Sequence, residues 1–200
     1  MGIEGIFAHS FSFFKDPLGR SAGERISRAA AVGAGAGTVA TLAMSSLMLA
    51  AKAAGLLGSL PPEKVTAYLL DRAGIRQSRK TQFVLAPLNH FVFGAGGGAV
   101  FGVAHLVLPR TLSLPLGLAF GSGIWALSYG GWIPALGIMP PPSRDRPGRP
   151  PAMLAAHLVY GGVLGAIFSH IPGLDPAVKM RGSVGGRPEQ LSNESDRRRL

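Results

Sequence analysis

The chain has 200 residues, of which 47% are hydrophobic and only 15% are charged, and its formal net charge is +10. Soluble domains carry charges on about 25% of their residues, so this composition argues against a soluble protein. The absence of cysteine excludes disulfides and thiolate metal sites. The basic residues flank apolar stretches, where the anionic headgroups of a lipid bilayer are the expected partner, and we therefore expect no nucleic-acid binding.

Four long stretches contain no charged residue, and they predict four transmembrane helices. These stretches cover residues 29–51, 81–109, 111–143 and 150–172. A spanning helix needs about 20 mostly apolar residues, so each stretch is long enough. We therefore predict an all-α integral membrane four-helix bundle, with helices over about residues 29–54, 82–108, 115–133 and 152–171.

The sequence outside these stretches predicts the remaining organisation. Residues 1–28 mix aromatic and basic residues, which indicates an N-terminal arm at the membrane interface. Residues 29–173 form the transmembrane domain, and residues 174–200 are polar and basic, as expected for a disordered C-terminal tail. Four spans place both termini on one side. Basic residues are divided almost evenly between the two sides, and the cations before the first span favour cytoplasmic termini.

The loop after the first span contains a predicted short helix. Pro61 and Pro62 suit the first turn of a helix, and Glu63 places a carboxylate at its positive end. Val65, Tyr68, Leu69 and Arg72 follow at helical spacing, and Gly74 is a suitable C-terminal cap. We expect an amphipathic helix on the membrane surface or against the bundle, too short to span.

Comparison of the chain with itself indicates an internal duplication. Residues 90–102 and 157–169 share a histidine, two glycines, a valine, an alanine and a phenylalanine in register, and residues 55–62 resemble residues 135–142. We infer two helical-hairpin repeats, about 29–108 and 114–172. Each repeat has two spans, so the copies have parallel orientations.

Glycines recur on the predicted spans at intervals of four residues. Lipid provides no hydrophobic drive between helices, so small residues that allow close backbone approach stabilise helix pairs in membranes. We expect helix packing at Gly33, Gly37, Gly94, Gly98, Gly102, Gly117, Gly121, Gly161 and Gly165.

Two histidines within apolar spans are the leading candidates for chemistry. His90 and His157 each precede their glycines by the same spacing, so the duplication predicts that both face the bundle interior. Facing histidines ligate haem or a metal, relay protons, or form structural hydrogen bonds. The spans contain no Asp or Glu that would join a metal site, and we assign no metal and no cofactor.

Aromatic residues complete the candidate site. Trp125, Tyr129 and Trp132 share one predicted helix face with Ser122, and Tyr160 follows His157 on the last span. Trp125 lies near mid-membrane, where its indole N–H needs a partner such as His90, Ser122 or Ser128. This aromatic face is explained either by helix packing or by a ligand pocket. We therefore name as tentative ligand or proton-linked residues His90, His157, Trp125, Tyr129 and Tyr160.

Motifs of soluble enzymes are absent from the sequence. The glycine run at residues 94–98 lies inside an apolar helix and follows no strand, so it is not a dinucleotide fingerprint. No combination of nucleophile, base and acid can be assembled with any specificity. We assign no catalytic residue and do not expect an enzyme.

Residues 124–141 carry a family resemblance: the segment Ile-Trp-Ala-Leu-Ser-Tyr-Gly-Gly-Trp-Ile-Pro-Ala-Leu-Gly-Ile-Met-Pro-Pro resembles the most distinctive part of the YagU-like bacterial inner-membrane proteins. The segment that begins at Pro61 and the two histidine-glycine helices are also similar to theirs. The resemblance covers about residues 28–171 and implies a multi-pass protein of the bacterial inner membrane, of unassigned biochemical function and loosely associated with acid tolerance.

These observations favour three classes of function, and an enzyme that acts on lipids ranks after them. The first is a role in membrane integrity or in acid and stress tolerance. The second is a subunit of a transporter or channel that works as a homo-oligomer, with the pathway between protomers. The third is a haem or metal membrane protein with His90 and His157 as ligands, which predicts a coloured preparation.

Overall fold

The structure is a computed structural model and describes residues 21–76 and 78–171. This part of the chain is all-helical and contains no strand. The α-helices are α2 (Ala22–Ala53), α3 (Pro61–Arg72), α4 (Arg79–Ala104), α5 (Ser113–Leu127), α6 (Ile133–Ala135) and α7 (Arg149–His170). Short 3₁₀ turns lie at Arg110–Leu112 and Pro142–Arg144, and a π-helical turn lies at Ser128–Trp132. The predicted C-terminal tail lies outside the described residues.

Three of the described helices, α2, α4 and α7, are long and apolar enough to cross a membrane. They also expose large apolar side chains such as Phe83, which is 81% exposed. Soluble monomers rarely expose extensive apolar surface, whereas lipid covers it at no cost. Together with the composition, these helices indicate a membrane protein.

The first long helix begins earlier than predicted. We expected it near Ala29, but α2 begins at Ala22, so residues 22–28 belong to the helix and not to an N-terminal arm. The reason is a capping box: Ser21 Oγ accepts from the Glu24 amide, and the Glu24 carboxylate accepts from the Ser21 amide. Residues 1–20, which hold the rest of the predicted arm, lie outside the described residues.

The segment after Arg110 is helical but not uniform. α5, the π-helical turn and α6 follow one another without a break from Ser113 to Ala135, and in the π-helical turn the amide of Ile133 donates to the carbonyl of Ser128. Pro134 has no amide proton to continue the α-helical pattern, and Gly130 and Gly131 tolerate the wider turn. The predicted third helix, residues 115–133, is therefore longer at both ends.

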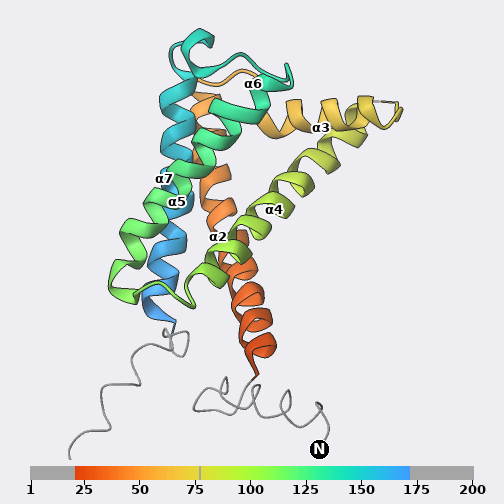
Figure 1. The fold of residues 1–200 in the computed structure, drawn as a ribbon. Helices are drawn as coiled ribbons and strands as arrows, with labels where there is room; N and C mark the ends of the chain where they lie inside the picture. Colours follow the sequence, from red (N-terminus) through yellow and green to blue (C-terminus); the bar gives the residue numbers. More distant parts are fainter. Residues whose placement is uncertain (1–20, 77, 172–200) are drawn as a thin grey trace, which may run out of the picture.

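The short helix in the first loop forms as expected. α3 begins at Pro61, and its last turn leads to Gly74, whose φ is +68°. Glu63 accepts from the amide of Leu60 and pairs with Lys52 at 3.0 Å, and Asn89 donates to Thr66 at 3.4 Å. These contacts tie α3 to the end of α2 and to α4, and in Figure 1 α3 extends sideways from the upper end of α2 to the start of α4.

The helices pack as two antiparallel pairs, α2 with α4 and α5 with α7, and α2 joins the pairs by also packing against α7. In each pair the backbones meet at glycines, where a Cβ atom would overlap the partner helix. Gly37 faces the carbonyl of Gly94 and the backbone of Gly98, while Gly117 faces the carbonyl of Gly161 and the backbone of Gly165. The remaining predicted glycines lie at the same two contacts: Gly33, Gly102 and Gly121.

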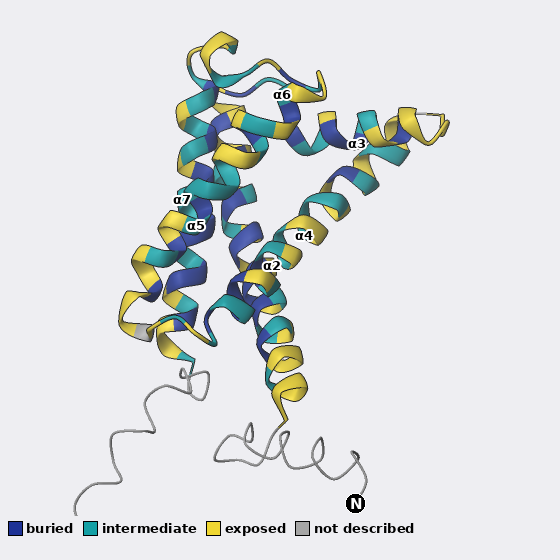
Figure 2. Ribbon diagram, in the orientation of Figure 1, coloured by how far each residue is buried: buried dark blue, intermediate teal, exposed yellow. Residues whose placement is uncertain are grey.

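α4 is the least buried of the three long helices. In its most apolar 18-residue window only 11% of residues are buried, against 39% for α2 and 44% for α7. Figures 1 and 2 show why: α4 crosses α2 near the glycines and then diverges from it toward α3, with exposed residues along its outer side. α2 and α4 therefore form a V that opens toward α3.

Candidate functional site: the cavity between the helix pairs

A cavity of about 150 Å³ lies where the two helix pairs meet, lined by residues of α2, α3, α4, α5, the π-helical turn and α7. Its walls are mainly apolar, with Met44 and Met48 from α2 and Met153 from α7. The polar side chains that line it include Thr41, Asn89, His90, Ser128, His157 and Tyr160. A cavity of this volume suits a molecule about the size of benzene.

The structure brings His90 and His157 to this one cavity, from α4 and α7 respectively. The Nδ1–H of His157 donates to the carbonyl of Met153 at 2.8 Å, which leaves Nε2 of the neutral ring as an acceptor. Nε2 of His90 is buried and has no hydrogen-bond partner among the described residues. An unsatisfied buried nitrogen is costly, so a small polar molecule that hydrogen-bonds to His90 would stabilise the site.

Tyr160 links the two helix pairs across the same cavity. Its hydroxyl on α7 donates to the carbonyl of Gly94 on α4 at 2.6 Å, and its side chain is buried. The absence of a side chain at Gly97 makes room for this hydroxyl, since a Cβ there would lie 2.9 Å from it. Tyr160 therefore couples the position of α7 to the helix that carries His90.

The aromatic face predicted on residues 122–132 is divided by the π-helical turn. Trp132 lines the cavity and stacks on Phe93, with ring centroids 6.4 Å apart. Trp125 and Tyr129 contact each other edge to face and do not line the cavity. The indole Nε1 of Trp125 is buried without a hydrogen-bond partner in the described part of the chain, and Ser128 donates to its own helix instead.

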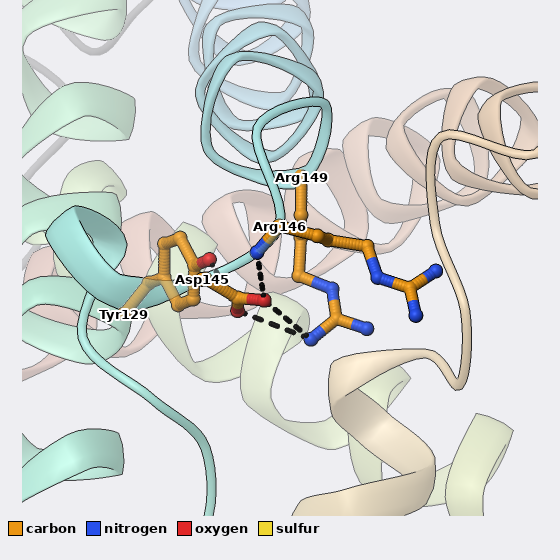
Figure 3. A network of polar contacts seen from close by, with 4 residues as sticks. All are labelled: Tyr129, Asp145, Arg146 and Arg149. Atoms are coloured by element: carbon orange, nitrogen blue, oxygen red, sulfur yellow. Dashed lines mark hydrogen bonds and ion pairs between the residues drawn. The ribbon is translucent and has the colours of Figure 1, made fainter.

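Tyr129 belongs to a polar network at the loop end of the bundle (Figure 3). Its hydroxyl donates to Asp145 Oδ2 at 2.7 Å, and Arg149 Nη1 donates to both oxygens of Asp145 at 3.1 Å. The Arg146 amide also donates to Asp145, at 2.7 Å. Arg149 is the first residue of α7, where its charge opposes the helix dipole, so the carboxylate offsets an otherwise unfavourable position.

The network changes the acidity of its carboxyl group. Burial raises the pKa of Asp145, but hydrogen bonds from Tyr129, the Arg146 amide and Arg149, with the charge of Arg149, outweigh burial and hold the pKa below its ordinary value. Asp145 is therefore ionised near neutral pH. The side chains of Arg149 and Asp145 are only 9% and 5% exposed, so the pair is a buried structural clamp.

Sequence reasoning missed this network and a second buried histidine. Asp145 is the only acidic residue between Asp71 and Asp175, a signal that its position is special. His105 is fully buried and forms a 2.7 Å hydrogen bond with Ser113, at the end of the bundle opposite the network. Its ring packs against Phe101 and Phe168. His105 is thus part of the core and lies outside the cavity.

A comparison with known proteins identifies the family but no activity. No curated protein and no solved structure matches the chain. The model of the Family of unknown function (DUF6789) matches residues 27–176, which include every described helix from α3 to α7 and nearly all of α2. This match covers most of the 200 residues. The chain therefore belongs to the Family of unknown function (DUF6789).

Proposed function

We propose that this chain is a membrane protein of four spans whose central cavity responds to protons through His90 and His157. The observation that carries the proposal is that these two histidines, from the two helix pairs, line one mainly apolar cavity. The unperturbed pKa of imidazole lies closer to physiological pH than that of any other side chain, so histidine is the usual proton-responsive residue. Protonation of both rings would place two like charges in a poorly solvated space, and their repulsion would favour water entry or separation of the helix pairs.

Three observations support four spans and the duplication. The run from Ser113 to Ala135 is helical without a break and packs along α7. The contacts of Gly37 with Gly94 and Gly98 recur as those of Gly117 with Gly161 and Gly165. The spacing from Gly37 to Gly117 equals the spacing from Gly55 to Ala135, where the two loop segments resemble each other. Two parallel hairpin repeats explain this agreement.

A proton-responsive bundle fits the membrane location and stress role predicted above. The resemblance to YagU-like proteins favours the bacterial inner membrane, with both termini on one side and in the cytoplasm, and a contribution to acid tolerance. Such a protein would alter the packing of its spans when the pH falls. It needs neither a catalytic residue nor a cofactor for this response.

The geometry is less favourable to the other two classes. A cavity of about 150 Å³ is much smaller than a haem, and the described residues hold no group of three or more side chains suited to a metal ion. A transporter or channel would need its pathway between protomers, as expected for an oligomer, and the exposed apolar faces are equally suited to lipid. We therefore rank the proton-responsive cavity first.

Tryptophan fluorescence tests the proposal, because Trp132 lines the cavity and the chain has only one other tryptophan. We would follow the W125F variant in lipid vesicles from pH 8 to pH 4. The emission of Trp132 should change with pH, and the change should disappear when H90Q and H157Q are added together. H170Q is the matched control, because His170 is exposed at the far end of α7, and it should leave the change intact. A pH response that survives loss of both cavity histidines would refute the proposal.

A further inference from the structure

The V between α2 and α4 encloses a lateral groove, distinct from the central cavity, with a volume of about 530 Å³. α2 forms one wall, α4 the other, and the start of α3 closes the end near the loops. The groove begins where the glycine contacts end, and its size lies within the range of small-molecule sites, about 300–1,000 Å³. It shares Met48, Pro62 and His90 with the cavity, so these three side chains lie between the two spaces.

The lining of the groove changes from charged to apolar along both helices. On α4 the lining residues follow one helix face, from Arg79 and Gln82 through Phe83 and Pro87 to Phe91. On α2 they run from Lys52 through Leu49 and Ser45 to Leu42. Both charged ends lie on the loop side, which is the membrane surface if α2 and α4 span the bilayer. The groove thus has a polar mouth at the headgroup level and an apolar floor within the membrane.

The length of the groove matches one leaflet. From Arg79 to His90 the axis of α4 rises by about 16 Å at 1.5 Å per residue. The hydrocarbon core of a bilayer is about 30 Å thick, so half of it is about 15 Å. A lipid with its headgroup at the mouth would extend its acyl chain as far as His90 at mid-membrane.

The charges at the mouth favour an anionic headgroup. Lys52 is paired with Glu63, whereas Arg79 has no ion pair or hydrogen bond from its side chain among the described residues. The groove therefore carries a net positive charge, and a guanidinium binds phosphate oxygens in a bidentate manner. At the level of the headgroups, anionic lipids supply this negative charge.

We propose that the groove between α2 and α4 binds one anionic glycerophospholipid, with its phosphate at Arg79 and an acyl chain along Phe83, Leu49 and Phe91. The site does not depend on the proton response of the cavity. It does depend on the membrane location of α2 and α4. It predicts that Arg79 makes the site selective for lipids with a negatively charged headgroup.

Native mass spectrometry of the full chain in mild detergent tests this assignment. Palmitoyl-oleoyl phosphatidylglycerol and phosphatidylcholine would be added separately, so that only the headgroup differs. We expect one tightly retained phosphatidylglycerol and much weaker retention of phosphatidylcholine. R79Q should weaken phosphatidylglycerol retention about fivefold, the factor expected for one basic residue at an anionic surface. K80Q is the matched control, since Lys80 is adjacent, equally charged and outside the groove.

A second variant tests the space for the acyl chain separately from the charge of Arg79. Ser45 is half-buried in the floor, and S45F would fill the space for an acyl chain while leaving Arg79 in place. S45F should abolish retention of the lipid with its helical circular dichroism unchanged. Equal retention of the two lipids, equal losses in R79Q and K80Q, or full retention in S45F would overturn the assignment. A dimer without bound lipid that S45F dissociates would identify a second copy of the chain as the occupant and overturn it as well.

Discussion

The hydroxyl of Tyr160 donates a 2.6 Å hydrogen bond to the backbone carbonyl of Gly94, and so joins α7 to α4 across the central cavity. Y160F removes this bond and leaves the ring in place. Side-chain hydrogen bonds between membrane helices average about 0.6 kcal/mol, so we expect the free energy of unfolding to fall by about that amount. Unfolding in detergent, followed by circular dichroism, measures the change. Y68F on α3 is the control, and an equal loss in both variants would contradict the linking role of Tyr160.

The glycine contact between α2 and α4 predicts that the effect of a Gly→Ala substitution on stability depends strongly on its position along α4. A Cβ at Gly98 would overlap the carbonyl of Gly33 and the Cα of Gly37, so G98A should destabilise the protein by about 1–3 kcal/mol. At Gly96 a Cβ meets nothing within 4 Å. G96A should therefore be neutral or stabilising by about 0.5–1 kcal/mol, because alanine favours a helix. Similar stability of the two variants would show that the helices do not pack as described.

The acid sensitivity of the loop end follows from Asp145. Because its pKa in the folded protein lies below the ordinary value of 3.8, the ionised carboxylate stabilises the fold above that pH. This contribution is lost as the pH falls through the lower, folded-state pKa. At pH 7, D145N should cost about 3 kcal/mol, since it leaves Arg149 buried without its partner.

The pH dependence distinguishes this effect from a general loss of structure. The stability difference between the parent and D145N should shrink as the pH falls below 3.8, because the parent carboxyl becomes neutral too. Unfolding curves at several pH values measure it. D71N, at an exposed position on α3, should have little effect at any pH. A constant difference down to pH 2 would contradict the electrostatic role of Asp145.

Local patterns were sufficient to predict the helices. Uncharged apolar stretches predicted the all-helical fold, and this is confirmed. Pro61, Pro62 and Gly74 predicted α3 to within two residues, because the signals for starting and ending a helix are local. The spacing of His90 and His157 ahead of their glycines led to the cavity, since residues one helical turn apart share a face.

Long-range contacts, the π-helical turn and the N-terminal cap of α2 could not be predicted in the same way. The contact of Tyr129 with Asp145 depends on how the loop before α7 folds back, which no periodic pattern encodes. The π-helical turn rotates Trp132 relative to Trp125. The two side chains therefore do not share one helix face, as α-helical spacing predicted. The capping box at Ser21 is visible in the sequence, but the charges at Arg25 and Arg28 led us to begin the helix after them.

The chain's central property in this account is four membrane crossings, and single-cysteine labelling tests it most directly. The chain has no native cysteine, so A73C, S143C and V107C each provide one exposed site. With four spans, a membrane-impermeant maleimide should label A73C and S143C from the same side, and V107C from the other. Labelling of S143C from the side of V107C would show that the segment from Ser113 to Ala135 does not cross, and would contradict the account.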